Sequence, residues 1–222
     1  MTFAPLVWTT TMADYSKLLH VRAADGGARL FLSVETSLAG EVQKQTLCVF
    51  ASHLDRVPCV GPIDGETLAH LRREHALCAA LDTGLRSLSV GGGSRVQLTQ
   101  KLCARGVARE LADEAADELS ARGYLQEREN ALAAAARDLR KLWGDRRILA
   151  DLRAKGYGDE ALCAVREYLA QQDGTARCVR LLEKKRIRTL DAQDADKLIA
   201  SLMRYGYTRT EIREALRRSV EG

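Results

Sequence analysis

The residue types in this sequence that could do chemistry are its six cysteines, its four histidines and the run Gly91-Gly92-Gly93 ahead of Ser94. The cysteines never form a C-x-x-C pair and lack a neighbouring histidine pair, so the spacing of a zinc site is absent. A phosphate-binding loop needs the pattern G-x-x-x-x-G-K-[ST], which does not occur. We expect the glycine run to be a linker and Ser94 to be a helix N-cap. The sequence therefore predicts no catalytic residue, no metal site and no cofactor, and a protein that is not an enzyme.

Charge and hydropathy describe the kind of protein that remains. With 222 residues, of which 46% are hydrophobic, the chain can bury a core. Residues 1–65 carry five basic and six acidic side chains, whereas the rest carries 29 basic and 24 acidic ones. This excess favours an acidic or polyanionic partner but is too small for binding DNA by charge alone. No apolar stretch of about 18 residues and no signal-peptide pattern occurs. We expect a soluble cytoplasmic monomer whose cysteines are small buried residues, with no membrane contact.

An internal repeat of fifty residues is the strongest pattern in the sequence. Gly106, Gly156 and Gly206 are spaced by 50 and 50, and the residues around them recur in register. Apolar residues stand eight and four positions before each glycine, so that each pair shares one face of a helix. These pairs are Leu98 with Leu102, Ile148 with Leu152, and Leu198 with Leu202.

Each repeated glycine is expected to end one helix and to precede another. Glycine adopts positive φ at the C′ position without a Cβ clash, which explains why it stands at the end of a helix. A second apolar helix pattern follows every glycine, and Thr208 with Glu211 has the spacing of a capping box at the start of the last one. A further helix is expected upstream of each pair, and in the second unit its stripe is Leu132, Ala136, Leu139 and Trp143.

These elements predict a mainly α fold of three tandem three-helix repeats that form an elongated, curved body. Such units leave apolar outer faces, which stacking against a neighbour buries. We place the repeats at residues 66–125, 126–172 and 173–222. In the first of them, helix prediction is weakened by Gly84 and by the glycine run at 91–93.

The first 65 residues form a separate, small β-containing module in this interpretation. Leu18–Val21 and Leu30–Val34 flank the turn residues Asp25-Gly26-Gly27, and Thr46–Ala51 is a third candidate strand. Pro58–Gly65 contains two prolines and two glycines and is predicted to be a linker.

Over roughly residues 76–220 the repeated pattern resembles the RecX regulatory proteins. Gly144-Asp145-Arg146-Arg147-Ile148 with Leu152 and Lys155-Gly156 is similar to the family block G-x-x-R-I-x-x-x-L-x-x-K-G, the most specific of the blocks. Further similar blocks are Ser94-Arg95-Val96-Gln97-Leu98, Gly123-Tyr124-Leu125-Gln126-Glu127 and Arg204-Tyr205-Gly206-Tyr207. The sequence departs from the family at Gly91, where an arginine is usual, at Asn130-Ala131, where a phenylalanine is expected, and at Gln126, where an acid is expected.

The resemblance implies a function without catalysis. RecX-like proteins lie in the helical groove of the RecA filament on single-stranded DNA and restrain its ATP hydrolysis and strand exchange. The implied partner is the RecA nucleoprotein filament, with single-stranded DNA as a second candidate. A curved rod that meets a repeating surface at several places gains affinity through multivalency.

Basic side chains on the expected helices are the candidate contacts with RecA or with phosphates. They fall into three groups, one in the second repeat, one in the densely basic stretch 176–188, and one along the last helix. The simpler explanations are a solvated helix face for the stretch 176–188, an ion pair across the unit for Arg147, and compensation of the helix dipole for Arg217 and Arg218. The candidates are Arg146, Arg147, Arg153, Lys155, Arg177, Arg180, Lys184, Lys185, Arg186, Arg188, Arg209, Arg213 and Arg217.

Three alternatives stay open. A direct DNA-binding protein could use the glycine turns in helix-turn-helix fashion, although the acids in Tyr157-Gly158-Asp159-Glu160 would repel phosphate. A scaffold for some other protein is a second alternative, and an enzyme that uses the N-terminal module is a third.

Overall fold

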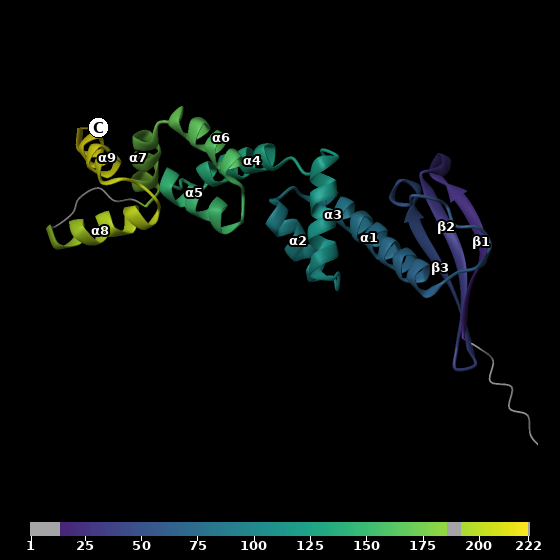
Figure 1. Ribbon diagram of the computed structural model, residues 1–222. Coiled ribbons are helices and arrows are strands. Elements are labelled where there is room, and N and C mark those ends of the chain that lie inside the picture. Colours follow the sequence, from purple (N-terminus) through teal and green to yellow (C-terminus); the bar gives the residue numbers. More distant parts are fainter. Residues whose placement is uncertain (1–13, 186–191, 222) are drawn as a thin grey trace, which may run out of the picture. The chain divides into compact units, whose positions relative to one another are not determined.

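The computed structural model describes residues 14–185 and 192–221 (Figure 1). The chain divides into two compact units between Thr83 and Gly84. None of the helices within the described ranges is long and apolar enough to cross a membrane.

The first unit contains a four-stranded antiparallel sheet with the strand order β3-β2-β1-β4 (Figure 1). The strands are β1 (Tyr15–Ala24), β2 (Arg29–Leu38), β3 (Glu41–Phe50) and β4 (Gly61–Pro62). Alternate residues of β2 are buried, as expected for a sheet with one face against a core. The three predicted strands are confirmed, and each is longer than predicted.

The predicted linker at 58–65 is corrected by the structure, because part of it belongs to the sheet. Gly61 and Pro62 pair with Leu18 and Lys17 of β1. Proline has no amide hydrogen to donate, which restricts it to the edge position that it occupies here.

Helix α1 (Gly65–Val90) completes the core of the first unit. Its Leu68 and Leu71 belong to one buried cluster with Leu18, Leu32 and Val49 of the sheet. The helix continues through Gly84, where the sequence predicted weakness. A Cβ at this position would lie 2.5 Å from Leu119 Cδ1, so the glycine makes room for that leucine.

The second unit contains the end of α1, from Gly84, and the helices that follow it. They are α2 (Arg95–Cys103), α3 (Arg109–Ala121), α4 (Glu127–Arg140), α5 (Asp145–Ala154), α6 (Asp159–Ala170), α7 (Gly174–Lys184), α8 (Ala192–Arg204) and α9 (Arg209–Glu221). One buried cluster is shared by α4, α5 and α6, and another by α7, α8 and α9. The protein is therefore mainly helical with a small N-terminal sheet, as predicted.

The repeated glycines end helices in the same way three times. Gly106, Gly156 and Gly206 have φ values of 87°, 76° and 97°. After each of them the next amide donates to the carbonyl oxygen five residues back, at 3.2, 3.2 and 3.3 Å. This bond pattern is a Schellman motif, which satisfies carbonyls left free at a helix end. The prediction that these glycines terminate helices is confirmed, as is the capping box at Thr208 and Glu211.

Two details of the predicted core differ. The buried face of α4 carries Ala131, Ala134, Ala135 and Asp138, whereas the leucine stripe beside it is only half-buried. Small residues allow the neighbouring helices to approach closely, which turns the larger side chains aside. Among the cysteines, only Cys78 and Cys178 are buried, while Cys59 and Cys163 are exposed.

Candidate functional site

Two hydrogen-bonded joints link distant parts of the second unit. The Ser94 hydroxyl, at the start of α2, donates to the Lys155 carbonyl oxygen at 2.5 Å. Fifty residues later, the Gly144 amide, at the start of α5, donates to the Tyr205 carbonyl oxygen at 2.8 Å. In both joints, the residue at the start of a helix forms a hydrogen bond with the residue that precedes a repeated glycine, 61 positions later in the sequence.

Close backbone approach makes the second joint possible. A Cβ on Gly206 would lie 2.5 Å from the backbone nitrogen of Arg147, and a Cβ on Gly144 would lie 2.3 Å from the carbonyl carbon of Gly206. Both positions therefore require glycine, one of them for its positive φ as well.

A row of alternating cations and aromatic rings lies beside this joint. The guanidinium carbon of Arg147 is 4.0 Å from the centre of the Trp143 ring and 5.5 Å from that of Tyr205. Lys141 Nζ lies 4.8 Å from the Trp143 ring, and Lys185 Nζ lies 4.6 Å from the Tyr205 ring. We name these five residues the basic–aromatic ladder. The distances are those of cation–π contacts.

The ladder brings together predicted candidates from two separate groups. Arg147 comes from the second repeat and Lys185 from the basic stretch, and Tyr205 is the ring between them. Lys141, Trp143 and Tyr205 were missed as site residues by sequence reasoning. The signal that could have found Tyr205 is its register, because it occupies the position of Arg105 and Lys155 in the repeat.

Arg177 does not lie on the surface, and its predicted contact with a partner stays a prediction. Its side chain is only 3% exposed and donates to Asp145 at 2.5 Å. Its guanidinium also lies 5.9 Å from the centre of the Tyr207 ring. Burial raises the pKa of Asp145, although the positive charge of Arg177 opposes this effect. Arg177 therefore stabilises the interior, because it occupies a register position of α7 that faces the core.

The other candidates of the basic stretch are exposed where the structure describes them. Arg180, Lys184 and Lys185 are exposed on α7 and its C-cap. Arg186 and Arg188 lie outside the described residues.

Helix α5 and its C-cap present the second group. Arg146 and Arg153 are exposed, and Arg147 is half-buried in the ladder. Lys155 forms an ion pair with Asp151 at 2.5 Å, which reduces the charge that it offers to a partner.

The third group of candidates lies on α9, where an acidic side chain partly neutralises its positive charge. Arg209 and Arg213 are exposed. Arg217 pairs with Glu214 at 2.9 Å, and Arg218 pairs with the same carboxylate at 3.1 Å. Together these arginines lower the pKa of Glu214 to about 2.

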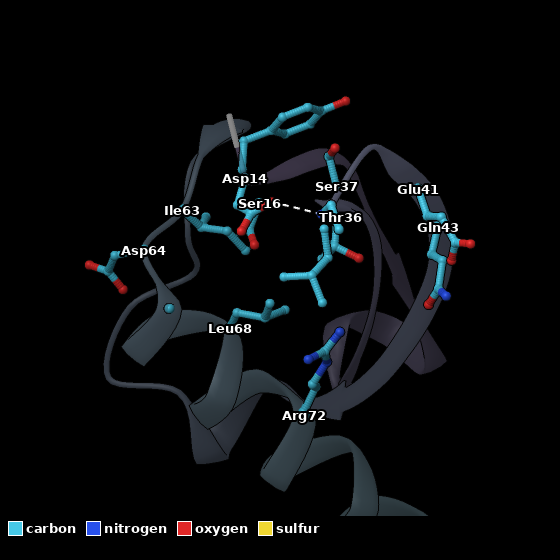
Figure 2. A pocket seen from close by; sticks show the side chains of 14 residues that line it. Asp14, Ser16, Thr36, Ser37, Glu41, Gln43, Ile63, Asp64, Leu68 and Arg72 are labelled. Carbon is cyan, nitrogen blue, oxygen red and sulfur yellow. Dashed lines mark hydrogen bonds between the residues drawn. The ribbon is translucent and has the colours of Figure 1, made fainter. Parts of the chain in front are cut away.

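One pocket of the first unit is shown in Figure 2. It has a volume of about 650 Å³ and lies beside the ends of β1 and β2. Its polar groups include Ser16, Thr36 and Ser37 of the strands and Arg72 of α1, together with the carboxylates of Asp14, Glu41 and Asp64 (Figure 2). Within the described ranges, no group of three or more His, Cys, Asp or Glu side chains could hold a metal ion.

Comparison with known proteins identifies the fold. No protein-family model matches the chain, and no curated protein matches it in sequence. A crystal structure of regulatory protein RecX matches with a TM-score of 0.70 and 17% identity, over 91% of this chain and 99% of that one. The crystal structure of RecX from Lactobacillus salivarius matches with a TM-score of 0.55 and 18% identity, over 66% of this chain and 97% of that one. The chain thus has the fold of the RecX regulatory proteins, as the sequence resemblance predicted.

Proposed function

We propose that this protein regulates a RecA filament by binding it on single-stranded DNA and inhibiting its ATP hydrolysis and strand exchange. The observation that carries the proposal is the fold match over nearly the whole length of a structure described as regulatory protein RecX. The sequence block around Arg147 and Ile148 supports it independently, since it resembles the most specific block of that family. In this role the protein acts in the cytoplasm as a monomer and needs no cofactor.

The proposed working unit is a three-helix repeat, present three times at 66–125, 126–172 and 173–222 in tandem after the N-terminal module of residues 1–65. The two equivalent joints, Ser94 to Lys155 and Gly144 to Tyr205, support this division because they recur with the same period as the sequence. A repeated body can contact successive subunits of a filament at once, and such multivalency raises affinity without a single strong contact.

We assign the first contact with the filament to the basic–aromatic ladder. Its outer cations, Lys141 and Lys185, are exposed, and the three groups between them are half-buried. Arg and aromatic residues dominate the energetics of many protein interfaces, because they combine large contact area with polar ends. The exposed Arg146, Arg153, Arg180, Lys184, Arg209 and Arg213 would extend the basic surface around the ladder.

The test is the ATPase activity of the cognate RecA on single-stranded DNA, with this protein added in substoichiometric amounts. We expect inhibition, and we expect the charge reversal Lys185→Glu to raise the half-inhibitory concentration several-fold. Lys185 is the better residue to reverse, because Lys141 is paired with the buried carboxylate of Asp138 at 2.6 Å. Lys101→Glu on α2 is the matched control, since Lys101 is exposed and lies outside the ladder.

Two results would count against the proposal. If hydrolysis is unchanged while the protein binds DNA by itself, direct DNA binding becomes the better explanation. If Lys101→Glu weakens inhibition as strongly as Lys185→Glu does, the ladder is not the contact surface.

A further inference from the structure

A second basic feature of the helical unit is a shallow pocket of about 480 Å³. It lies where the C-terminal ends of α4 and α6 meet α7. The residues that line it are Ala136, Leu139, Arg140, Leu142, Tyr168, Gln172, Arg177 and Arg180.

The lining carries positive charge that its own residues do not neutralise. It contains three arginines and no carboxylate. Arg140 and Arg180 are exposed, and neither forms an ion pair or side-chain hydrogen bond with any residue in the described part of the chain. The nearest acid in sequence, Asp138, is occupied by Lys141 at 2.6 Å. Arg140 and Arg180 are thus available to an anion from outside.

Arg177 contributes a positive charge whose position is held by burial and by an ion pair, unlike that of a mobile surface arginine. It is 3% exposed, it lines the pocket, and its only ion pair among the described residues is with Asp145. Its Nε is buried without a hydrogen-bond partner in the described structure.

The rest of the lining is aromatic and apolar. Tyr168, Leu139 and Leu142 line the pocket and are half-buried. A bare carboxylate would have no use for such a wall, whereas a nucleotide presents a flat base and a phosphate together. Stacking of bases on aromatic side chains with arginine on the backbone is the usual way in which single strands are bound.

We propose that this pocket binds one nucleotide unit of single-stranded DNA. The base would stack on Tyr168, and the phosphate would lie between Arg140 and Arg180. The inference rests on the proposed function, which makes single-stranded DNA part of the partner. Free nucleotides share this chemistry, and the test separates the two sources.

The experiment measures fluorescence anisotropy of a labelled oligothymidylate titrated with the full chain, without RecA, at several salt concentrations. We expect Arg140→Gln and Arg180→Gln each to weaken binding several-fold and to reduce the salt slope by about one unit. Tyr168→Leu should weaken binding roughly fivefold or more, and Tyr168→Phe should restore it, because the ring alone stacks. Arg166→Gln is the control, since Arg166 is exposed on α6 but does not line the pocket.

Competition with thymidine monophosphate then identifies the source. If thymidine monophosphate displaces the oligonucleotide, and the pocket variants weaken this displacement, the pocket binds a single nucleotide. If thymidine monophosphate does not compete, the pocket requires a DNA strand. Both results support the pocket. If binding is undetectable, or if the control lowers it as much as Arg180→Gln does, the inference is overturned. It is also overturned if Arg180→Gln abolishes RecA inhibition but leaves DNA affinity unchanged, because the pocket then receives an acidic protein group. Pocket-dependent DNA binding without RecA inhibition would instead remove only the proposed function.

Discussion

The Ser94 hydroxyl of α2 donates a hydrogen bond to the carbonyl oxygen of Lys155, at the end of α5, across 61 residues of sequence. Its oxygen also accepts from the Gln97 amide, so that one side chain caps α2 and fastens it to a neighbouring turn. In the second joint, a backbone amide takes the place of this hydroxyl. The protein therefore makes the same connection once with a side chain and once without.

Ser94→Ala should lower the free energy of unfolding by about 1–2 kcal/mol, since it removes an N-cap and a buried hydrogen bond together. Urea unfolding followed by circular dichroism measures this change. Ser89→Ala is a suitable comparison, because the Ser89 hydroxyl is exposed and bonds only within its own helix. Equal losses in the two variants would contradict the role of Ser94 in the joint.

Alanine substitutions at the repeated glycines should distinguish the energetic cost of a positive φ from the cost of a steric clash with a neighbouring backbone. Gly106→Ala should cost about 1 kcal/mol, because φ is 87° but no atom lies within 4 Å of the new Cβ. Gly206→Ala should cost clearly more, since its Cβ would lie 2.5 Å from the backbone of Arg147. Thermal and urea unfolding of both variants test this order, and the reverse order would show that the second joint is not tightly packed.

Replacing Arg177 should destabilise the fold, whereas replacing Arg180 should not. Arg177→Met removes a buried guanidinium and leaves Asp145 without its partner, which we expect to cost roughly 1–3 kcal/mol, because this carboxylate keeps some contact with water. Arg180→Met changes an exposed side chain and should shift the unfolding free energy by less than about 0.5 kcal/mol. Similar effects in urea unfolding would mean that Arg177 is a surface residue after all.

Stability should fall at alkaline pH partly through one buried thiol. Burial raises the pKa of Cys178 to about 12, whereas an unfolded thiol titrates near 8.5. Between these values the unfolded state releases a proton that the folded state keeps, so the unfolding free energy decreases as pH rises. Cys178→Ala should reduce this decrease by roughly 1 kcal/mol per pH unit between pH 9 and 11.

The matched comparison is Cys163→Ala, because Cys163 is exposed. Urea unfolding at pH 7, 9, 10 and 11 provides the measurement. A slope that Cys178→Ala does not alter would contradict the burial of this thiol.

Local features of the fold could be predicted because they depend on residues that are close together in the sequence. The Schellman turns at the repeated glycines depend on φ at one residue, and the Ser94 and Thr208 caps depend on residues three positions apart. The strands around Asp25–Gly27 likewise follow from alternation and a turn.

The site could be predicted only in part, because its residues meet through tertiary structure. Trp143 and Tyr205 come together through Arg147, and this contact exists only because Gly144 and Gly206 let two backbones approach. Arg177 and Arg180 look alike in sequence, and only the rotation of α7 toward Asp145 buries the first and exposes the second.

Because α1 runs through both compact units, the boundary between them resists cleavage and is a poor place to divide the chain. Its residues up to Thr83 belong to the sheet-containing unit and those from Gly84 to the helical unit, so their boundary lies within a continuous helix. Limited proteolysis should cut slowly there, since a protease needs an extended substrate and the helix must first unwind. A gene split at this boundary would divide α1 into residues 65–83 and 84–90, so neither product would contain the whole helix.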